Sequence, residues 1–389
     1  MIGYASWALK TLLVTNDFPP KVGGIQSYLF ELVSSLDPSW VRVLAPAYPG
    51  AAEFDARQPF EVFREPTSRL YPSPGLLRRI CDLSAGMDVV QFGYVLQSWV
   101  LAPATQRQTG LPYVVFAHGA EVLFPLRIPG AARLLLWGTL KWAAEVLAVS
   151  EHTAAGVERY TRGRVGCTVL RPIVDLEKFR PLGGYRAEVR ARHGLAKRPV
   201  ILCVSRLTAR KGQDRLIDVL PPLRRQFGAR LLLAGEGPFG GSLLRRARRR
   251  GVEKDIVFAG RVPDEMLPSY YGAADVFAMP ARSRWLGVEE EGFGVVFVEA
   301  AAAGLPMVVG SSGGAREALQ DGVTGFLVNG CSTPEIKQAL ARLIGDDRLR
   351  SRMGAAARER AVALHDVSVV GERYRKVLER ASRQRKPAG

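Results

Sequence analysis

The stretch TLLVTNDFPPKVGGIQSYLFEL, residues 11–32, joins a short apolar run to an amphipathic segment through a loop with two prolines and two adjacent glycines. The apolar run predicts a buried strand, and the segment after the glycines predicts a helix. Gly23 and Gly24 lack the Cβ atoms that would keep a ligand from the backbone, and the first amides of a helix have no partner within it. The pattern therefore favours an anion such as a phosphate at the start of this helix. The residues alone also fit a tight strand-to-helix turn without a ligand.

The same alternation of apolar runs and amphipathic segments continues along the chain. Nearly continuous apolar strands separated by helices are typical of parallel sheets that are covered on both faces. We therefore predict an α/β protein with two doubly wound, Rossmann-like domains facing across a cleft, because ligands of such sheets bind at the carboxyl ends of the strands. The predicted strands are TLLVT, VRVLAP, DVVQFG, PYVVFAH and EVLAVS in the first half, and VILCVSR, RLLLAGEG, IVFAGRV, ADVFAMP, LPMVVGS and TGFLV in the second.

A polar, basic segment rich in proline and glycine, residues 171–198, lies between the two sets of strands. Such composition is typical of a linker. We expect an N-terminal domain over residues 1–172, a linker over 173–198 and a C-terminal domain over 199–365. A helix over about residues 366–382 is expected to pack back on the N-terminal domain.

The net charge of the chain is strongly positive. Its 389 residues include 54 Lys and Arg against 37 Asp and Glu, which gives a net charge of +17. This balance favours anionic partners, which include phosphorylated ligands, acidic lipid surfaces and nucleic acid. No strand pattern of interleaved basic and aromatic residues accompanies the charge, so we expect no nucleic-acid partner. The composition does not indicate an oligomeric state.

Cysteine, histidine and hydropathy patterns narrow the class of protein further. The four cysteines and four histidines show no spacing typical of zinc ligands or of a disulfide framework, which favours a reducing, cytoplasmic compartment. No apolar stretch has the length of about 18 residues that a transmembrane helix needs. The segment MIGYASWALKTLL lacks the basic region that opens a signal peptide. We therefore expect a soluble chain.

Three segments concentrate basic residues. They are LLRRARRRG (243–251), the tail RASRQRKPAG (380–389) and LYPSPGLLRRI (70–80). Each also fits a solvated helix face or a frayed terminus. The third combines apolar side chains with Arg78 and Arg79, as a segment at an anionic membrane surface does, so we expect this stretch to rest on the bilayer.

Charged residues cluster at two predicted strand ends. VSRLTARKGQDRL places Arg206 and Lys211 between a strand and a helix that begins near Gln213, and two cations there suit a diphosphate. An arginine-rich chain could also place them there by chance. EEEGFGVVFVEAAAAGLP (289–306) joins Glu291 to a turn with free amides and to a helix carrying Glu299, which could accept hydrogen bonds from sugar hydroxyls. Glu291 could instead cap that helix.

These elements together resemble a known family. The glycine pair, R-L-x₃-K-G at 206–212, and E-G-F-G-x₄-E at 291–299 before a G-x-P strand resemble the retaining family-four glycosyltransferases with the GT-B fold, over about residues 11–365. TNDFPPKVGGIQSY, SRLTARKGQD and MPARSRWLGVEEEGFGVVFVEAAAAG are similar to the actinobacterial phosphatidylinositol mannoside mannosyltransferases. In that group the loop before the Glu-Gly pair is lengthened, as RSRWLGVEE is here.

The resemblance implies roles for individual residues. His118 matches the histidine that contacts the transferred sugar, although without the family pattern a lone histidine more often has a structural role. Glu291 matches the carboxylate beside that sugar. Arg206 and Lys211 match the cations that neutralise the diphosphate leaving group, and Glu299 matches the carboxylate that holds the ribose. The other expected donor contacts are the backbone of Gly23, Gly24, Gly292, Phe293, Gly294 and Val295, and the backbone around Val262 for the base.

The resemblance also implies that the N-terminal domain is the acceptor domain and the C-terminal domain the nucleotide-sugar domain, and it implies the reaction. It is the retaining transfer of a hexose, with mannose from GDP-mannose favoured, to a lipid-linked acceptor such as a phosphatidylinositol mannoside, by a cytoplasmic enzyme that can lie on the membrane face. The sequence has no D-x-D triplet, so we expect the two cations to stabilise the leaving diphosphate without a metal or other cofactor. A UDP-sugar with a different acceptor, a non-catalytic nucleotide-sugar binding protein, and a phosphorylase or epimerase remain as alternatives. The sequence leaves open whether retention proceeds by same-face attack or through a covalent intermediate.

Overall fold

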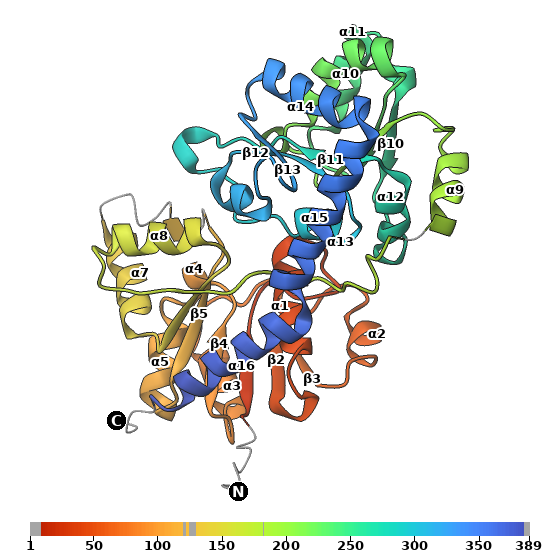
Figure 1. The fold of residues 1–389 in the computed structure, drawn as a ribbon. Helices are drawn as coiled ribbons and strands as arrows, with labels where there is room; N and C mark the ends of the chain where they lie inside the picture. Colours follow the sequence, from red (N-terminus) through yellow and green to blue (C-terminus); the bar gives the residue numbers. More distant parts are fainter. Residues whose placement is uncertain (1–8, 120–121, 124–129, 182, 385–389) are drawn as a thin grey trace, which may run out of the picture. The chain divides into compact units, whose positions relative to one another are not determined.

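The chain forms two units, and each is built on one parallel sheet (Figure 1). A computed structural model describes residues 9–119, 122–123, 130–181 and 183–384. The first unit comprises residues 1–173 and 367–389, and the second comprises residues 174–366. The chain therefore crosses between the units twice, at residues 173–174 and 366–367.

The first unit has a sheet with strand order β3-β2-β1-β4-β5-β6-β7, and its paired strands are parallel. All five predicted strands of this half are present. Two further strands, β3 and β7, were not predicted: β3 is a half-buried edge strand with charged residues, and β7 has only two residues. The strands are β1 (Thr11–Val14), β2 (Val41–Pro46), β3 (Glu61–Glu65), β4 (Val89–Phe92), β5 (Tyr113–Ala117), β6 (Glu145–Ala148) and β7 (Thr168–Val169).

Helices cover this sheet, and the C-terminal helix α16 is one of them. Tyr374 of α16 is buried, and its hydroxyl donates a hydrogen bond to Gln91 Oε1 of the central strand β4 (2.7 Å). The described helices of this unit are α1 (Gly24–Ser34), α2 (Ala51–Asp55), α3 (Pro74–Leu83), α4 (Val95–Ser98), α5 (Leu101–Thr109), α7 (Ala131–Trp142), α8 (Glu151–Tyr160) and α16 (Val367–Ser382), with a 3-10 turn at Pro38–Trp40.

The second unit repeats the scheme with strand order β10-β9-β8-β11-β12-β13, again with parallel pairs. All six predicted strands of this half are present. The strands are β8 (Val200–Val204), β9 (Arg230–Ala234), β10 (Ile256–Gly260), β11 (Val276–Met279), β12 (Met307–Gly310) and β13 (Gly325–Val328). The helices are α9 (Gly183–Arg192), α10 (Gln213–Phe227), α11 (Gly240–Arg249), α12 (Leu267–Ala273), α13 (Val295–Ala302), α14 (Thr333–Gly345) and α15 (Asp347–His365).

Helix α9 lies inside the segment that the sequence predicts to be a linker. Its Arg186 and Arg190 both pair with Asp275, at 2.6 and 2.7 Å, and Arg190 is buried. Asp275 also accepts a hydrogen bond from the Val200 amide (2.8 Å). This part of the expected linker is therefore folded onto the second unit, because its arginines meet a carboxylate that precedes β11.

Candidate active site

The glycine loop of the first unit is shaped by side chains on either side of it. Asp17 accepts hydrogen bonds from Lys21 (2.9 Å) and Gln26 (2.6 Å). A Cβ on Gly23 would overlap the end of the Gln26 side chain, so a larger residue at position 23 would displace the amide that donates to Asp17. A Cβ on Gly24 would meet nothing within 4 Å, and α1 has no side-chain N-cap. The start of α1 is therefore open where an anionic ligand would approach.

His118 follows β5 and is almost fully buried. Its Nε2 lies 2.8 Å from the Gly93 carbonyl oxygen, which can only accept, so the proton is on Nε2. The imidazole packs edge-on against Tyr28 (5.7 Å between centroids) and parallel to Phe116 (6.2 Å). Tyr28 lies on α1, one turn after Gly24. The first unit thus brings His118 close to the start of α1.

In the second unit Lys211 and Glu291 form an ion pair. Lys211 Nζ donates to Glu291 Oε2 at 2.7 Å, and Arg210 Nη1 donates to the same oxygen. The side chains of Lys211 and Glu291 are only 11% and 9% exposed. Burial alone would raise the pKa of Glu291, but the two cations outweigh it and hold that pKa below its ordinary value. The carboxylate therefore stays ionised and fixed in position.

Arg206 is arranged differently from Lys211. It follows β8 and is exposed, and its backbone carbonyl accepts a hydrogen bond from Gln213 Nε2 (3.1 Å). Among the described residues its guanidinium has no ion-pair partner. The structure thus places Arg206 at the same strand end as Lys211 but does not join it to the Glu291 cluster. Its side chain is available to an anionic ligand.

The turn after Glu291 leads into α13. Gly294 is the N-cap of this helix, with φ +94°, and no side-chain hydrogen bond caps the helix. Capping by Glu291 is therefore the wrong alternative, since its carboxylate pairs with Lys211 and Arg210 instead. Phe293 is buried against the ring of His365 (5.6 Å). The neighbouring Gly292 and Val295 are half-buried.

Two other predicted donor residues lie at the edges of this site. Glu299, in the second turn of α13, accepts a hydrogen bond from the Tyr271 hydroxyl (2.6 Å), and burial together with this carboxylate raises the pKa of Tyr271. Val262 is half-buried and follows β10. The preceding Arg261 amide donates to Glu236 Oε1 (3.3 Å). The Gly235 amide also donates to the Gly260 carbonyl (2.7 Å), so the ends of β9 and β10 meet where the base is expected.

Two features of the cluster escaped the sequence interpretation. Arg210 shares Glu291 with Lys211, although it occupies an unspecified position of the R-L-x₃-K-G motif. Arg282 donates to both carboxylate oxygens of Asp214 (2.9 and 3.0 Å). The many charges of ARKGQDR indicate that ion pairs form here. The sequence does not show which carboxylate accepts them, because Glu291, the partner of Lys211, is 80 residues away.

The segment predicted to meet the membrane differs from the expectation. Its apolar residues face the core of the first unit: Leu76 and Ile80 of α3 are buried. Arg78 and Arg79 are exposed, and Arg79 also lies near Glu65 (3.6 Å). The expectation of apolar bulk available to lipid is therefore wrong for these residues, because α3 uses its apolar face to cover the sheet. Basic charge and Tyr71, which is 66% exposed, remain on the surface.

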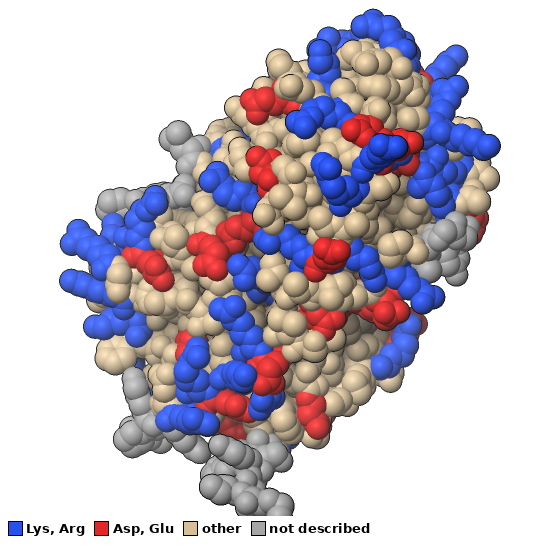
Figure 2. Space-filling view, viewed as in Figure 1, with Lys and Arg blue, Asp and Glu red and all other residues tan. Residues whose placement is uncertain are grey.

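The other basic clusters are partly neutralised. Figure 2 shows basic side chains gathered over α11. In this cluster Arg246 and Arg250 pair with Asp218 at 2.6 and 2.9 Å, and Arg248 pairs with Glu253 at 3.0 Å. A solvated, ion-paired helix face accounts for them. In the tail cluster residues 385–389 lie outside the described residues, as do residues 1–8 of the segment considered for a signal peptide.

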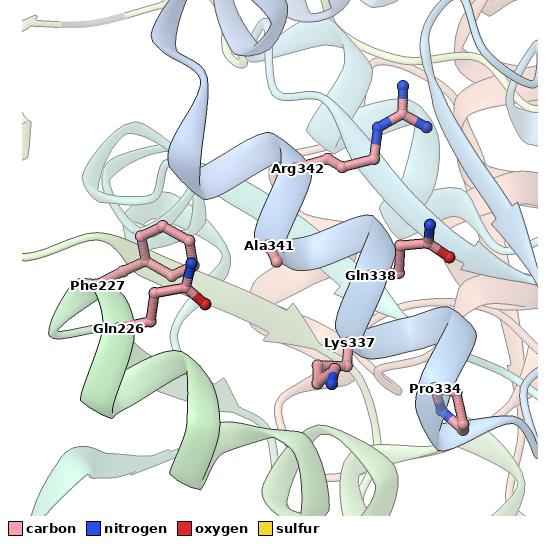
Figure 3. Close-up of a pocket in the computed structure, with 7 residues that line it drawn as sticks. All are labelled: Gln226, Phe227, Pro334, Lys337, Gln338, Ala341 and Arg342. Carbon is pink, nitrogen blue, oxygen red and sulfur yellow. The ribbon is translucent and has the colours of Figure 1, made fainter.

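A surface hollow lies between the C-terminal end of α10 and helix α14 (Figure 3). Phe227 provides an aromatic wall, and Lys337 and Arg342 provide charge. None of the predicted donor residues lines it. The lining residues are Gln226, Phe227, Pro334, Lys337, Gln338, Ala341 and Arg342.

The comparisons with known proteins agree with this architecture. The family model described as "Glycosyltransferase Family 4" matches residues 22–178, and the model "Glycosyl transferases group 1" matches residues 186–360. HepE of Anabaena, solved in complex with UDP, has a TM-score of 0.82 at 22% identity and covers 95% of this chain and 100% of its own. This likeness shows the fold. None of the described helices combines the length and apolar character needed to cross a membrane.

Two curated relatives match along nearly the whole chain. The GDP-mannose-dependent alpha-(1-6)-phosphatidylinositol monomannoside mannosyltransferase of Mycolicibacterium smegmatis is 39% identical and covers 90% of this chain and 93% of its own. The GDP-mannose-dependent monoacylated alpha-(1-6)-phosphatidylinositol monomannoside mannosyltransferase of Corynebacterium glutamicum is 34% identical, with coverage of 95% and 98%. Fold and site together define an enzyme of the GT-B class. The chain belongs to the family-four glycosyltransferases, and the predicted fold class and family are confirmed.

Proposed function

We propose that this chain transfers a mannosyl residue from GDP-mannose to a phosphatidylinositol mannoside, with retention at the anomeric carbon and without a metal. The relatives that share 34 to 40% of their residues with it carry names that state this donor and acceptor class. One structural observation supports glycosyl transfer most directly. A buried lysine–carboxylate pair, Lys211 and Glu291, lies at the strand end that also presents the exposed Arg206.

The two cations fit the charge that develops in the reaction. When a glycosyl diphosphate breaks, negative charge grows on the leaving diphosphate, and cations already in position stabilise that transition state. The Arg206 guanidinium has no ion-pair partner in the described part of the chain, so it is available for this purpose. Lys211 is held by Glu291 within the site, so it needs no large rearrangement to reach a phosphate oxygen. We assign the leaving-group stabilisation to these two residues.

Glu291 and the turn after it suit the sugar. An ionised carboxylate accepts hydrogen bonds from sugar hydroxyls, and the low pKa of Glu291 keeps it ionised. The amides of the turn at residues 292–295 are assigned to the same sugar, and Glu299 is assigned to the ribose.

The first unit is assigned the distal phosphate and the reacting face of the sugar. The open start of α1 at Gly24 suits a phosphate oxygen. His118, whose ring is fixed by Gly93 and Tyr28, is assigned a contact with the sugar.

A screen of donors and acceptors tests the proposal. Purified chain is incubated with GDP-mannose, UDP-glucose or UDP-N-acetylglucosamine, with and without phosphatidylinositol monomannoside, and the lipids are analysed by mass spectrometry. We expect one hexose to be added only from GDP-mannose, and about a thousandfold slower product formation by the Lys211→Ala variant. Transfer from a UDP-sugar instead, or donor consumption without any mannolipid product, would overturn the assignment.

We also propose that the first unit rests on an anionic membrane surface while it acts on a lipid acceptor. The support is the exposed basic side of α3, with Arg78 and Arg79, and the net charge of +17. Each basic residue near an anionic bilayer contributes about 1 kcal/mol to binding. Because the apolar residues of α3 are buried, we expect this association to be mainly electrostatic.

Sedimentation with vesicles tests the membrane proposal. Binding should rise with the fraction of anionic lipid and fall with salt. The Arg78→Glu/Arg79→Glu variant should lose binding and lipid transfer but keep hydrolysis of GDP-mannose in solution. The control is Arg225→Glu/Arg249→Glu, which makes the same charge change at exposed arginines of the second unit. Equal binding by both variants would show that α3 is not the docking surface.

A further inference from the structure

The connection between β11 and the turn at Glu291 is a hairpin, residues 280–291. The Arg284 amide donates to the Glu289 carbonyl (2.8 Å), and the Glu289 amide donates to the Arg284 carbonyl (3.2 Å). Their side chains also pair, at 3.2 Å. The hairpin tip therefore consists of the few residues between them, with a 3-10 turn at Trp285–Gly287.

The base of this hairpin is closely packed against other backbone segments of the second unit. Three glycines from other parts of the second unit, at positions 212, 310 and 330, approach the Pro280–Ala281 backbone so closely that a Cβ on any of them would overlap its oxygen atoms. Ion pairing adds to this packing. Arg282 pairs with Asp214 at two oxygens, and both side chains are at most 13% exposed. The tip is thus carried on a rigid support.

The tip presents a tryptophan in an unfavourable backbone conformation. Trp285 is 69% exposed and has φ +54°, in the left-handed region that bulky residues rarely adopt. A large apolar side chain gains nothing from exposure to water, and strained backbone conformations gather at binding sites. The Arg284 guanidinium lies 5.8 Å from the indole ring centroid. The hairpin therefore displays an aromatic face beside a cation.

The hairpin tip is connected to the site residue Glu291 by a short stretch of backbone. Only Glu290 separates Glu289 from Glu291 in the sequence, so the tip stays within roughly 16 Å of Glu291 along the backbone and across the bridge. The Glu291 amide donates to Ser312 Oγ (3.3 Å), and its carbonyl accepts from the Gly314 amide (2.9 Å). Both ends of this connection are therefore fixed relative to each other. The tip is therefore held within that distance of Glu291.

We propose that Trp285 is an acceptor-recognition residue. Its indole packs against the C–H face of a ring polyol of the acceptor, and Arg284 beside it pairs with the acceptor phosphodiester. The electron-rich face of an indole attracts electropositive groups, which include the C–H bonds on one side of a cyclic polyol. A guanidinium suits a phosphate oxygen. This inference rests on the proposed function, since it takes the acceptor to be an inositol phosphodiester that carries a sugar.

Steady-state kinetics with a water-soluble acceptor tests the inference. The probe is the deacylated acceptor, a glycerophosphoinositol mannoside, which needs no membrane. Trp285→Ala should raise the KM for this acceptor by about tenfold, in the range found for loss of an aromatic stacking partner. Trp285→Phe should keep most of the affinity. The KM for GDP-mannose, and its slow hydrolysis without acceptor, should stay within about twofold of the parent in both variants. Trp142→Ala, at an exposed tryptophan of the first unit, is the matched control.

Three results would overturn the inference. One is an unchanged KM for the deacylated acceptor in Trp285→Ala. Another is an equal loss of donor hydrolysis, which would indicate a structural role in the donor site. The third is a defect seen only with acceptor in vesicles, together with lost vesicle binding, because the tryptophan would then be a membrane anchor. If the parent itself transfers nothing from GDP-mannose to either acceptor form, the proposed function fails and the inference fails with it.

Discussion

The two units hold their predicted site residues by different means. In the second unit charged side chains hold each other: Lys211 and Arg210 share Glu291, and Arg282 holds Asp214. In the first unit Gly24 is set by the start of α1, and His118 is set by a backbone carbonyl and by aromatic rings that pack against it. Ion pairs therefore position the site residues of the second unit, whereas backbone geometry and packing position those of the first unit.

This difference indicates what each unit contributes to recognition of the donor. A lysine paired with a carboxylate can exchange that partner for a phosphate oxygen, so the second unit can respond to the charge of the donor. A glycine amide and a buried ring respond to its shape. Substitutions in the second unit should therefore act on turnover and pH dependence, whereas those in the first unit should act on donor fit.

Removal of a phosphate cation should give the largest effect. Lys211→Ala and Arg206→Ala are each expected to lower kcat/KM by about a thousandfold, because each charge interacts more strongly with the departing diphosphate than with the intact donor. Lys254→Ala, at an exposed lysine of the same unit, is the control. A loss of less than tenfold in either cation variant would contradict the electrostatic role of the second unit.

Gly24→Ala tests whether the shape of the first unit at the start of α1 limits donor binding. The structure leaves space for this Cβ, so thermal stability should change little, but the methyl group would stand where we place the donor phosphate. We expect the KM for GDP-mannose to rise by about tenfold to a hundredfold, since a clash or a lost phosphate contact acts on binding. Gly138→Ala, which also has open space around its Cβ, should behave like the parent. A parent-like KM in Gly24→Ala would place the phosphate elsewhere.

Arg210→Gln tests the electrostatic environment of Glu291 with a smaller expected loss of activity. In the parent, Arg210 and Lys211 hold the pKa of Glu291 below its ordinary value, so the ionised carboxylate is lost only as pH falls through that low pKa. Without Arg210 this pKa rises, and the acid limb of the kcat/KM profile should move to higher pH. Near neutral pH the loss should stay within about tenfold, because Lys211 still pairs with Glu291. An unshifted acid limb would show that Arg210 does not tune Glu291.

A chelator should have the smallest effect. If Arg206 and Lys211 supply the charge that a metal would otherwise provide, transfer should continue in excess EDTA at close to the untreated rate. Complete loss of activity that magnesium or manganese restores would show that cations from the protein are insufficient.

The sequence predicted most of the framework. Apolar runs located all the central strands, because strands buried on both faces must be apolar almost throughout. It missed the edge strand β3, whose sequence EVFRE carries charge on a half-buried surface. It also assigned α9 to a linker, because the partner of its arginines, Asp275, lies more than 80 residues further along the chain.

The site was predicted in part. The motif spacing located Lys211 and Glu291, but spacing could not show that Arg210 completes their cluster or that Arg206 stands apart from it. Those facts depend on how loops from different strands meet. In α3 the sequence showed apolar and basic residues together, yet only the packing of the helix shows that Leu76 and Ile80 face the core. Residue identity indicated which charged residues gather at the candidate site better than it indicated side-chain direction.

Retaining mannosyl transfer is tested most directly by the anomeric configuration of the product. The purified chain is supplied with GDP-α-mannose and the deacylated phosphatidylinositol monomannoside, and the new glycosidic linkage is examined by NMR. We predict a single added mannose in α linkage, formed by the parent and about a thousandfold more slowly by Lys211→Ala. A β-linked product, or no mannosylated product from a correctly folded preparation, would contradict the account.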